Sequence, residues 1–187
     1  MKIIVMIMFL LTSMALWADK RPNILFFLVD DMGIGDTSVP FLYKDGEPQK
    51  IELNDLYRTP NIAKLAESGR IFTNAYSYSV CSPTRISLMT GQSAPRHRVT
   101  TWTHPKQSSI DTGLVKTGGI RSPADWRVKG LDHSLPLLPR LMKKTGYRTI
   151  FAGKAHFGPD DTPSGDPTNL GFDVNIAGFG GGGPGSY

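Results

Sequence analysis

The chain has 187 residues, of which 40% are hydrophobic and 20% are charged, and 21 Lys and Arg against 16 Asp and Glu give a net charge of +5. This composition is typical of a globular domain, and it excludes a disordered, a collagen-like or a polytopic membrane protein. The length fits one domain or slightly more, which is enough chain to bury a hydrophobic core.

Residues 1–18 predict a secretory signal peptide. Lys2 precedes an apolar run from Ile3 to Leu11, small residues follow, and no acidic residue occurs before Asp19. These are the basic, apolar and cleavage-site regions of such a peptide. The apolar run is too short to span a bilayer of about 30 Å. We therefore expect an exported protein, periplasmic or secreted, without a stable membrane anchor.

Cys81 is the only cysteine of the sequence. An exported chain with one cysteine has no intrachain disulfide, so packing must supply its stability. A lone thiol in an oxidising compartment pairs with another chain, lies buried, or has a chemical role. The count alone favours a buried, inert thiol.

Three segments predict β-strands. Residues 23–29 (NILFFLV) form a continuous apolar run, which is typical of a strand buried on both faces of a parallel sheet. Residues 70–78 (RIFTNAYSY) are rich in residues with high β-propensity. Residues 147–152 predict a third, short strand.

Three helices are predicted between and after these strands, at residues 59–69, 82–90 and 134–145. Each begins near a proline, the first two after a Thr or Ser N-cap, and each stops at a glycine. The helices alternate with the strands, which predicts an α/β layered fold with a largely parallel central sheet flanked by helices. Two apolar stripes are expected to face the core: Ile62, Leu65 and Ala66 in the first helix, and Leu138, Leu141 and Met142 in the third.

Two segments predict irregular structure. Residues 92–130 show no sustained period, and a loop of that length is typically functional. Residues 96–102 (RHRVTTW) within it are either a substrate loop or a plain surface loop. From Pro159 onward the sequence is dominated by Gly, Pro and Asp, and no regular element is predicted there.

Three polar clusters follow directly after the predicted strands. They are Asp30-Asp31, residues 81–85 and residues 153–156. In open α/β sheets, ligands bind beyond the carboxyl ends of the strands. The clusters are therefore expected to converge in space if the strands are parallel neighbours.

Taken alone, each cluster has two interpretations. The adjacent carboxylates either offer hard oxygen ligands for Ca²⁺ or Mg²⁺, or they only turn the chain. Cys81 and Arg85 either form an anion site at a helix N-terminus, or they belong to a capped helix with a surface arginine. Lys154 and His156, two apart on an extended segment, either supply a cation and a proton carrier or form a solvated turn.

Together, these motifs resemble the sulfatase family. Residues 81–91 (CSPTRISLMTG) match its first signature, C-x-P-x-R-x-x-L-x-T-G, and residues 146–156 (GYRTIFAGKAH) match its second. Residues 21–33 resemble the first strand of the family and its metal ligands. The resemblance covers residues 21–156 and implies the fold of the alkaline-phosphatase-like superfamily.

The resemblance implies a modified nucleophile and a metal. A formylglycine-generating enzyme, the maturation partner of sulfatases, would convert Cys81 to formylglycine, whose hydrated aldehyde attacks the sulfate ester. Asp30, Asp31 and the modified Cys81 would hold Ca²⁺, with Mg²⁺ as the second choice. Both metals fit the hard oxygen ligands of this cluster.

The resemblance also implies the remaining roles in the site. Arg85 would orient the formylglycine, Lys154 would bind a sulfate oxygen, and His156 would hydrogen-bond the nucleophile. The family completes its metal and anion sites with residues far downstream, and nothing after His156 fits them. Residues 21–187 are therefore expected to be the N-terminal part of a longer sulfatase catalytic domain.

The implied reaction is hydrolysis of an organic sulfate ester on a sulfated small molecule or glycan. One alternative is a phosphate or phosphonate ester hydrolase of the same superfamily. Another is a non-catalytic secreted protein that binds a metal and a glycan. Nucleic acid is not an expected partner, because the basic residues of this exported chain are not interleaved with aromatic residues.

Overall fold

The computed structural model describes residues 21–106 and 130–186. Its contacts divide the chain into unit 1, Met1–Ser68, and unit 2, Gly69–Tyr187, and each unit is described by itself. The predicted signal peptide and residues 107–129 of the predicted loop lie outside the described residues. Within the described part of the chain, no helix is both long enough and apolar enough to cross a bilayer.

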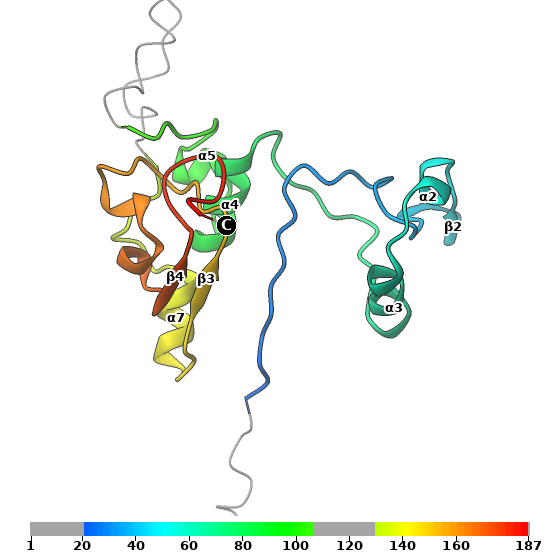
Figure 1. Ribbon diagram of the computed structural model, residues 1–187, viewed down its shortest axis with the longest axis horizontal. Helices are drawn as coiled ribbons and strands as arrows, with labels where there is room; N and C mark the ends of the chain where they lie inside the picture. Colours follow the sequence, from blue (N-terminus) through cyan, green and yellow to red (C-terminus); the bar gives the residue numbers. More distant parts are fainter. Residues whose placement is uncertain (1–20, 107–129, 187) are drawn as a thin grey trace, which may run out of the picture. The chain divides into compact units, whose positions relative to one another are not determined.

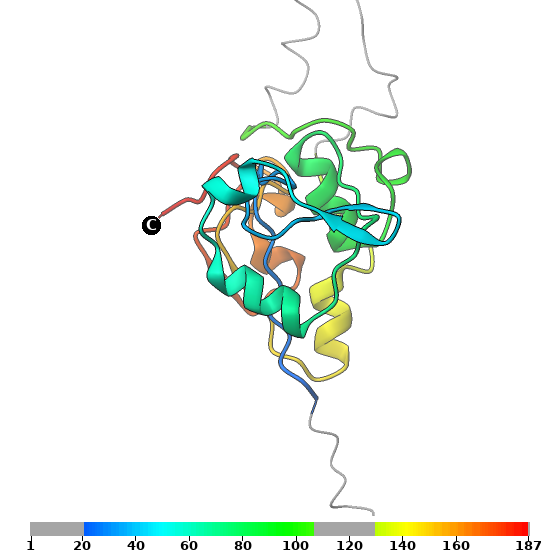
Figure 2. The same cartoon turned by 90° about the vertical axis from the view of Figure 1, so that its right-hand side faces the viewer.

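Unit 1 contains a small hairpin followed by two helices (Figures 1 and 2). Strand β1 (Leu42–Lys44) pairs antiparallel with β2 (Glu47–Gln49). The two turn residues, Asp45 and Gly46, have φ of 52° and 85°, as a type I′ hairpin requires. Asp-Gly between two short extended segments is a typical hairpin signal.

Helices α2 (Leu53–Leu56) and α3 (Pro60–Ser68) follow the hairpin. The prediction of α3 is confirmed, including its start at a proline and its end before Gly69. The hydroxyl oxygen of Thr59 accepts a hydrogen bond from the Ser38 backbone N–H at 2.9 Å. This residue therefore ties the start of α3 to an earlier loop of unit 1. The predicted stripe of α3 is only partly covered, because Leu65 is exposed.

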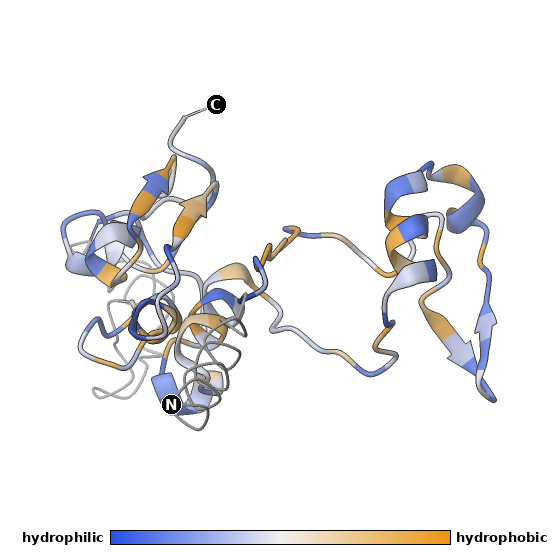
Figure 3. Ribbon diagram, turned by 90° about the horizontal axis from the view of Figure 1, so that it is seen from below, coloured by the Kyte–Doolittle hydropathy of each residue, from blue (hydrophilic) through white to orange (hydrophobic). Residues whose placement is uncertain are grey.

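The prediction of a buried strand at residues 23–29 is wrong for this structure. The segment joins no ladder among the described residues, and Leu25 and Phe27 are 79% and 78% exposed. A strand is stabilised by hydrogen bonds to a neighbouring strand. Without such a neighbour in the described part of the chain, this apolar run forms no ladder and its side chains remain exposed to solvent. Figure 3, coloured by hydropathy, shows the hydrophobic residues of the chain in orange.

Unit 2 carries most of the regular structure and all of the larger core. Strand β3 (Ile150–Ala152) pairs parallel with β4 (Val174–Ile176), with Ile150 opposite Val174. Figure 1 shows the two arrows side by side, and Figure 3 colours them largely orange. The other elements are α4 (Cys81–Thr90), α5 (Ala94–His97), α7 (Leu138–Lys144), and the 3₁₀ turns η3 (Pro163–Gly165) and η4 (Pro167–Leu170).

Helix α4 lies at the centre of unit 2, where it packs against α5 and α7. Three aromatic rings join this region to the strands, since Phe151 packs edge-on against Phe157 and Phe172 with centroid distances of 5.6 and 5.2 Å. Fully burying a large apolar side chain such as Phe, Leu or Ile stabilises a fold by about 1.5–3 kcal/mol. The buried core consists of Ile86, Met89, Val99, Leu131, Leu137, Ala155, Phe157 and Leu170.

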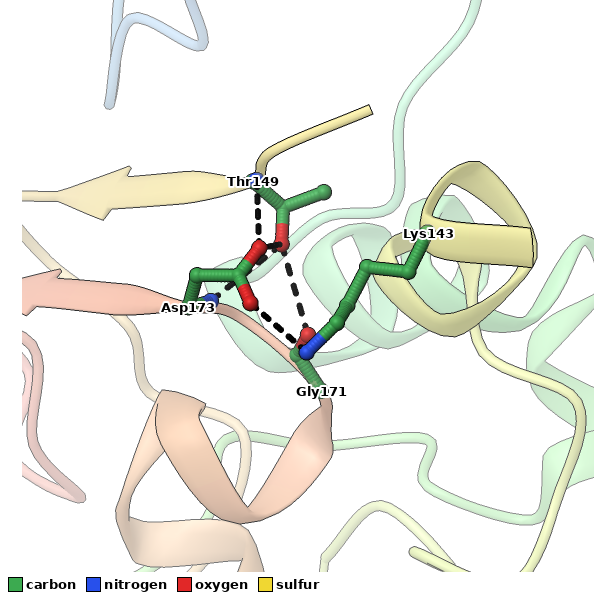
Figure 4. Close-up of polar contacts among 4 residues, drawn as sticks. All are labelled: Lys143, Thr149, Gly171 and Asp173. Carbon is green, nitrogen blue, oxygen red and sulfur yellow. Dashed lines mark hydrogen bonds and ion pairs between the residues drawn. The ribbon is translucent and has the colours of Figure 1, made fainter. Parts of the chain in front are cut away.

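A polar cluster fixes the start of β3 and β4 (Figure 4). The Asp173 carboxylate accepts hydrogen bonds from the Thr149 N–H at 2.8 Å and the Thr149 hydroxyl at 3.1 Å. It also pairs with Lys143 of α7 at 2.7 Å. The salt bridge and these hydrogen bonds lower the pKa of Asp173 from 3.8 to about 2. The carboxylate therefore links α7 to the parallel strand pair.

Three other predictions for unit 2 need correction. Residues 70–78 form no strand, and Tyr76 is 91% exposed. Helix α7 begins at Leu138 and presents Pro139 to the interior next to the buried Leu137, whereas the predicted face with Leu138 and Leu141 is exposed. The segment after Pro159 is ordered into η3, η4 and β4.

The α/β class is confirmed by helices around a parallel strand pair, whereas no larger central sheet forms among the described residues.

Candidate active site

The first site element is the N-terminus of α4. The helix begins at Cys81, after Val80 in extended conformation, and its last turn closes on Gly91 at a φ of 65°. A left-handed residue at this position favours glycine, which explains the glycine of the motif. Ser82 is therefore not the N-cap that the sequence predicted; it lies inside the first turn, fully buried.

Cys81 and His156 are in direct contact. The Cys81 Sγ lies 3.1 Å from His156 Nδ1, although 75 positions separate the two residues. Cys81 is half-buried, and His156 is 5% exposed. The cysteine count alone favoured a buried, inert thiol. The Cys81 thiol is instead only half-buried, and it contacts an imidazole nitrogen.

The other ring nitrogen of His156 faces a backbone carbonyl. His156 Nε2 lies 2.8 Å from the Thr103 carbonyl oxygen, which can only accept a hydrogen bond. Nε2 therefore carries the hydrogen, and in the neutral ring Nδ1 presents its lone pair to Cys81.

The backbone at His156 is left-handed, with a φ of 53°. The prediction of an extended segment is therefore wrong at His156. A non-glycine residue in this region costs about 1–3 kcal/mol. The His156 N–H donates to the Phe179 carbonyl at 3.2 Å, so the late segment of unit 2 holds this conformation.

Arg85 joins α4 to the same turn. One of its guanidinium nitrogens donates to the Lys154 carbonyl at 2.6 Å, across 69 positions of sequence. Arg85 is buried and Lys154 is half-buried. The helix N-terminus carries partial positive charge and the Arg85 guanidinium carries a full one, and both favour an anion.

A second histidine, His97, stabilises α4 from the side of α5. Its Nδ1 accepts from the Val99 N–H at 3.2 Å, so its Nε2 carries the hydrogen and donates to the Ser87 hydroxyl at 2.9 Å. Burial lowers the pKa of His97 below 6.5. This neutral, hydrogen-bonded ring has a packing role.

Asp30 and Asp31 belong to unit 1 and are exposed. Their carboxylate oxygens are of the kind that Ca²⁺ or Mg²⁺ prefers. Within residues 21–106 and 130–186, however, no three His, Cys, Asp or Glu side chains form a group that could hold a metal ion. The donor chemistry fits the predicted metal, but the two carboxylates alone do not complete its coordination.

Two of the three predicted polar clusters therefore meet in unit 2. Cys81 and Arg85 from α4 contact the turn with Lys154 and His156. Sequence reasoning missed Thr103, because it lies in a stretch without periodicity or a motif. The Ser-Pro signal did mark Ser82, but it pointed to a capping role.

The family of the chain follows from its match to known sequences. A sequence model of the family described as Sulfatase matches residues 22–182, which includes all of the residues predicted for the site. The chain belongs to the sulfatase family. The resemblance drawn from the three motifs is thereby confirmed.

Individual sulfatases show the same similarity. Human N-acetylgalactosamine-6-sulfatase is 37% identical over 158 residues, which cover 83% of this chain and 25% of that protein. Human steryl-sulfatase is 31% identical over 159 residues, which cover 84% of this chain and 23% of that protein. The chain thus spans about a quarter of the length of these curated relatives.

A solved structure titled "Crystal structure of Ps i-CgsB" has a related fold. It superposes with a TM-score of 0.55 at 28% identity, covering 82% of this chain and 27% of that chain. Together with the family match, this similarity supports an α/β sulfatase fold for the chain.

Proposed function

We propose that the protein is a sulfatase that hydrolyses an organic sulfate ester. The observation that carries this proposal is the Cys81–His156 contact of 3.1 Å at the N-terminus of α4, in a chain of the sulfatase family. The contact supports the proposal because an imidazole nitrogen, which can accept a proton, lies beside the side chain that the family motif assigns as nucleophile. An inert, buried thiol would not need such a neighbour.

The nucleophile in this proposal is formylglycine at position 81. A formylglycine-generating enzyme uses an external two-electron oxidant to convert the Cβ of Cys81 to an aldehyde, with the sulfur leaving as sulfide, and water then hydrates the aldehyde. One hydroxyl of the hydrate attacks sulfur and the alcohol leaves, so that a covalent sulfate ester forms. The second hydroxyl then loses its proton, the aldehyde re-forms and sulfate departs. Splitting one difficult hydrolysis into two steps is the advantage of covalent catalysis.

His156 is the proton acceptor in these steps. Its Nδ1 faces position 81 while Nε2 is engaged by the Thr103 carbonyl, so proton transfer occurs at Nδ1. General base catalysis of this kind typically contributes about 10²- to 10⁴-fold in rate.

Arg85 and Lys154 supply positive charge to the sulfate oxygens and to the nucleophile. The bond from Arg85 to the Lys154 carbonyl fixes the guanidinium relative to the turn that carries Lys154. Donors that are positioned before the reaction stabilise developing charge without reorganisation, and losing one typically costs about 10²–10³ in turnover.

A Ca²⁺ ion is part of the proposal, and Asp30, Asp31 and the modified Cys81 would be among its ligands, as the family resemblance implies. When bound, such a cation neutralises sulfate oxygens and lowers the pKa of a coordinated hydroxyl. Ca²⁺ takes about six to eight oxygen ligands, so further oxygen donors must complete the site.

The proposed substrate is a sulfated carbohydrate. One support is the similarity to proteins named N-acetylgalactosamine-6-sulfatase. Another is Trp102, which is 48% exposed and packs against His104 with ring centroids 4.6 Å apart. The two rings flank Thr103, which contacts His156. An exposed aromatic face beside the site offers a surface on which a sugar ring can pack. The N-terminal segment fits export to a compartment where such glycans occur.

The test combines mass spectrometry with paired substrates. Protein from a host with a formylglycine-generating enzyme should yield a residue-81 peptide that is lighter than the cysteine form, and it should hydrolyse an aryl sulfate faster than the matched aryl phosphate. Cys81→Ala should remove this activity. Turnover with an intact thiol would refute the nucleophile, and preference for the phosphate would identify a phosphate ester hydrolase instead.

A further inference from the structure

The hydroxyl of Ser82 connects two distant segments of unit 2. It donates to the His156 carbonyl at 3.0 Å and accepts from the Thr103 N–H at 3.0 Å. The Thr103 hydroxyl lies 3.3 Å away. Because the only hydrogen of Ser82 is used by the His156 carbonyl, the Thr103 hydroxyl is the donor in this third contact.

These contacts form a closed ring of interactions around the imidazole. Ser82 holds the backbone of both Thr103 and His156, and the Thr103 carbonyl in turn holds the His156 side chain at Nε2. Ser82 is fully buried, so water does not compete for these bonds. Ser82, which is next to the proposed nucleophile, thus sets the distance between the Thr103 carbonyl and the His156 imidazole.

The left-handed backbone of His156 makes this support necessary. A residue at a φ of 53° keeps that conformation only when the surrounding structure fixes it. The Ser82 hydroxyl binds the carbonyl of the strained residue, and Phe179 accepts a bond from its N–H. Of these two bonds, only the one from Ser82 also reaches Thr103.

We propose that Ser82 is a positioning residue that fixes the tautomer of His156, with the hydrogen on Nε2 and with Nδ1 directed at position 81. Ser82 acts through Thr103 and does not itself touch the reacting atoms. The catalytic consequence rests on the proposed sulfatase function, whereas the tautomer itself is a property of the folded chain.

The first measurement uses the 187-residue chain with Cys81 as a thiol. The ¹⁵N chemical shifts of the His156 ring, recorded by NMR at one pH, show which nitrogen carries hydrogen. We expect hydrogen on Nε2 and slow exchange of the Thr103 amide hydrogen. An Nε2 without hydrogen in the wild-type chain would overturn the proposal, and this result needs no variant to fold.

The second measurement compares two serines of the same helix. Ser82→Ala removes the bonds to residues 103 and 156, whereas Ser87→Ala removes a bond to His97. We expect Ser82→Ala to populate both tautomers of His156 and to speed Thr103 amide exchange at least tenfold. Ser87→Ala should leave both signals at their wild-type values. Unchanged signals in a folded Ser82→Ala variant would refute the positioning role.

The third measurement links the tautomer to turnover in enzyme whose Cys81 has been converted to formylglycine. Ser82→Ala should lower kcat about ten- to a hundredfold, because small misplacements of a catalytic group have effects of this size, and KM should change less than twofold. A wild-type enzyme without sulfatase activity would refute the proposed function but not the tautomer. A raised KM with unchanged kcat would instead refute the positioning role of Ser82.

Discussion

Arg85 donates a hydrogen bond of 2.6 Å to the backbone carbonyl of Lys154, and this bond joins the two signature motifs of the chain. The Cys81–His156 contact joins the same two segments. Each motif therefore contributes one residue to each contact. The shared geometry explains why residues that are about 70 positions apart belong to one site.

The proposed base can be tested by removing its ring. His156→Ala should lower kcat by about 10²- to 10⁴-fold, because Nδ1 no longer takes the proton from the hydrate at position 81. Steady-state kinetics on an aryl sulfate measures the effect. His133→Ala is the matched control, since His133 is exposed, and it should keep wild-type kcat. A His156→Ala enzyme within threefold of wild type would exclude this residue as the base.

The carbohydrate proposal predicts a substrate-dependent effect at Trp102. Trp102→Ala should raise KM for a sulfated sugar about two- to tenfold, which corresponds to the loss of one aromatic packing contact. KM for a small aryl sulfate should stay unchanged, because that substrate does not reach the ring. Tyr76→Ala, which removes another exposed aromatic ring of unit 2, controls for nonspecific effects. Equal changes for both substrates would argue against a sugar subsite.

The cluster around Asp173 predicts acid sensitivity. The pKa of this carboxyl is about 2 in the folded chain against 3.8 ordinarily, so the folded state prefers the charged form. The stabilisation is complete above about pH 4, is lost as the pH falls toward 2, and levels off below that.

In Asp173→Asn, the thermal midpoint should therefore depend less on pH between 4 and 2 than in the wild-type chain. Lys143→Gln should reduce the dependence in part, because it removes the salt bridge and leaves the bonds to Thr149. Lys144→Gln, next to it on α7, should behave as wild type. Identical pH profiles for Asp173→Asn and wild type would show that the cluster does not contribute to stability.

Helices α3 and α4 could be predicted from the sequence because their signals are local. Each starts at or near a proline and stops at a glycine, and the hydrogen bonds of a helix connect residues four positions apart. The match of the two motifs also predicted that His156 would lie next to Cys81, as it does, but it did not predict the bond from Arg85 to the Lys154 carbonyl.

Strands and supporting residues were harder to predict because they depend on distant partners. The apolar run at residues 23–29 has the pattern of a buried strand, yet it pairs with no described segment. Strand β4 lies in a Gly- and Pro-rich stretch and forms because Asp173 and Thr149 hold it against β3. Thr103 acts through its backbone carbonyl, and no side-chain pattern reports such a role.

The core position of Leu170 tests the order of the segment after Pro159. Leu170→Ala should destabilise the chain by about 2–5 kcal/mol, because it leaves a cavity in a fully buried site. Leu141→Ala, on the exposed face of α7, should change stability by less than about 0.5 kcal/mol. Urea unfolding measures both. Equal, small effects would mean that this segment does not pack into the core.

The proposed Ca²⁺ site predicts reversible loss of turnover when the metal is removed from the active enzyme. Excess chelator should abolish activity, and added Ca²⁺ should restore it, because the proposed cation neutralises the sulfate oxygens. Asp30→Asn and Asp31→Asn should each raise the Ca²⁺ concentration for half-maximal activity at least tenfold. Asp45→Asn, in the β1–β2 turn, changes a carboxylate outside the proposed site and should leave that concentration unaltered. Full activity in excess chelator would remove both aspartates from the metal site.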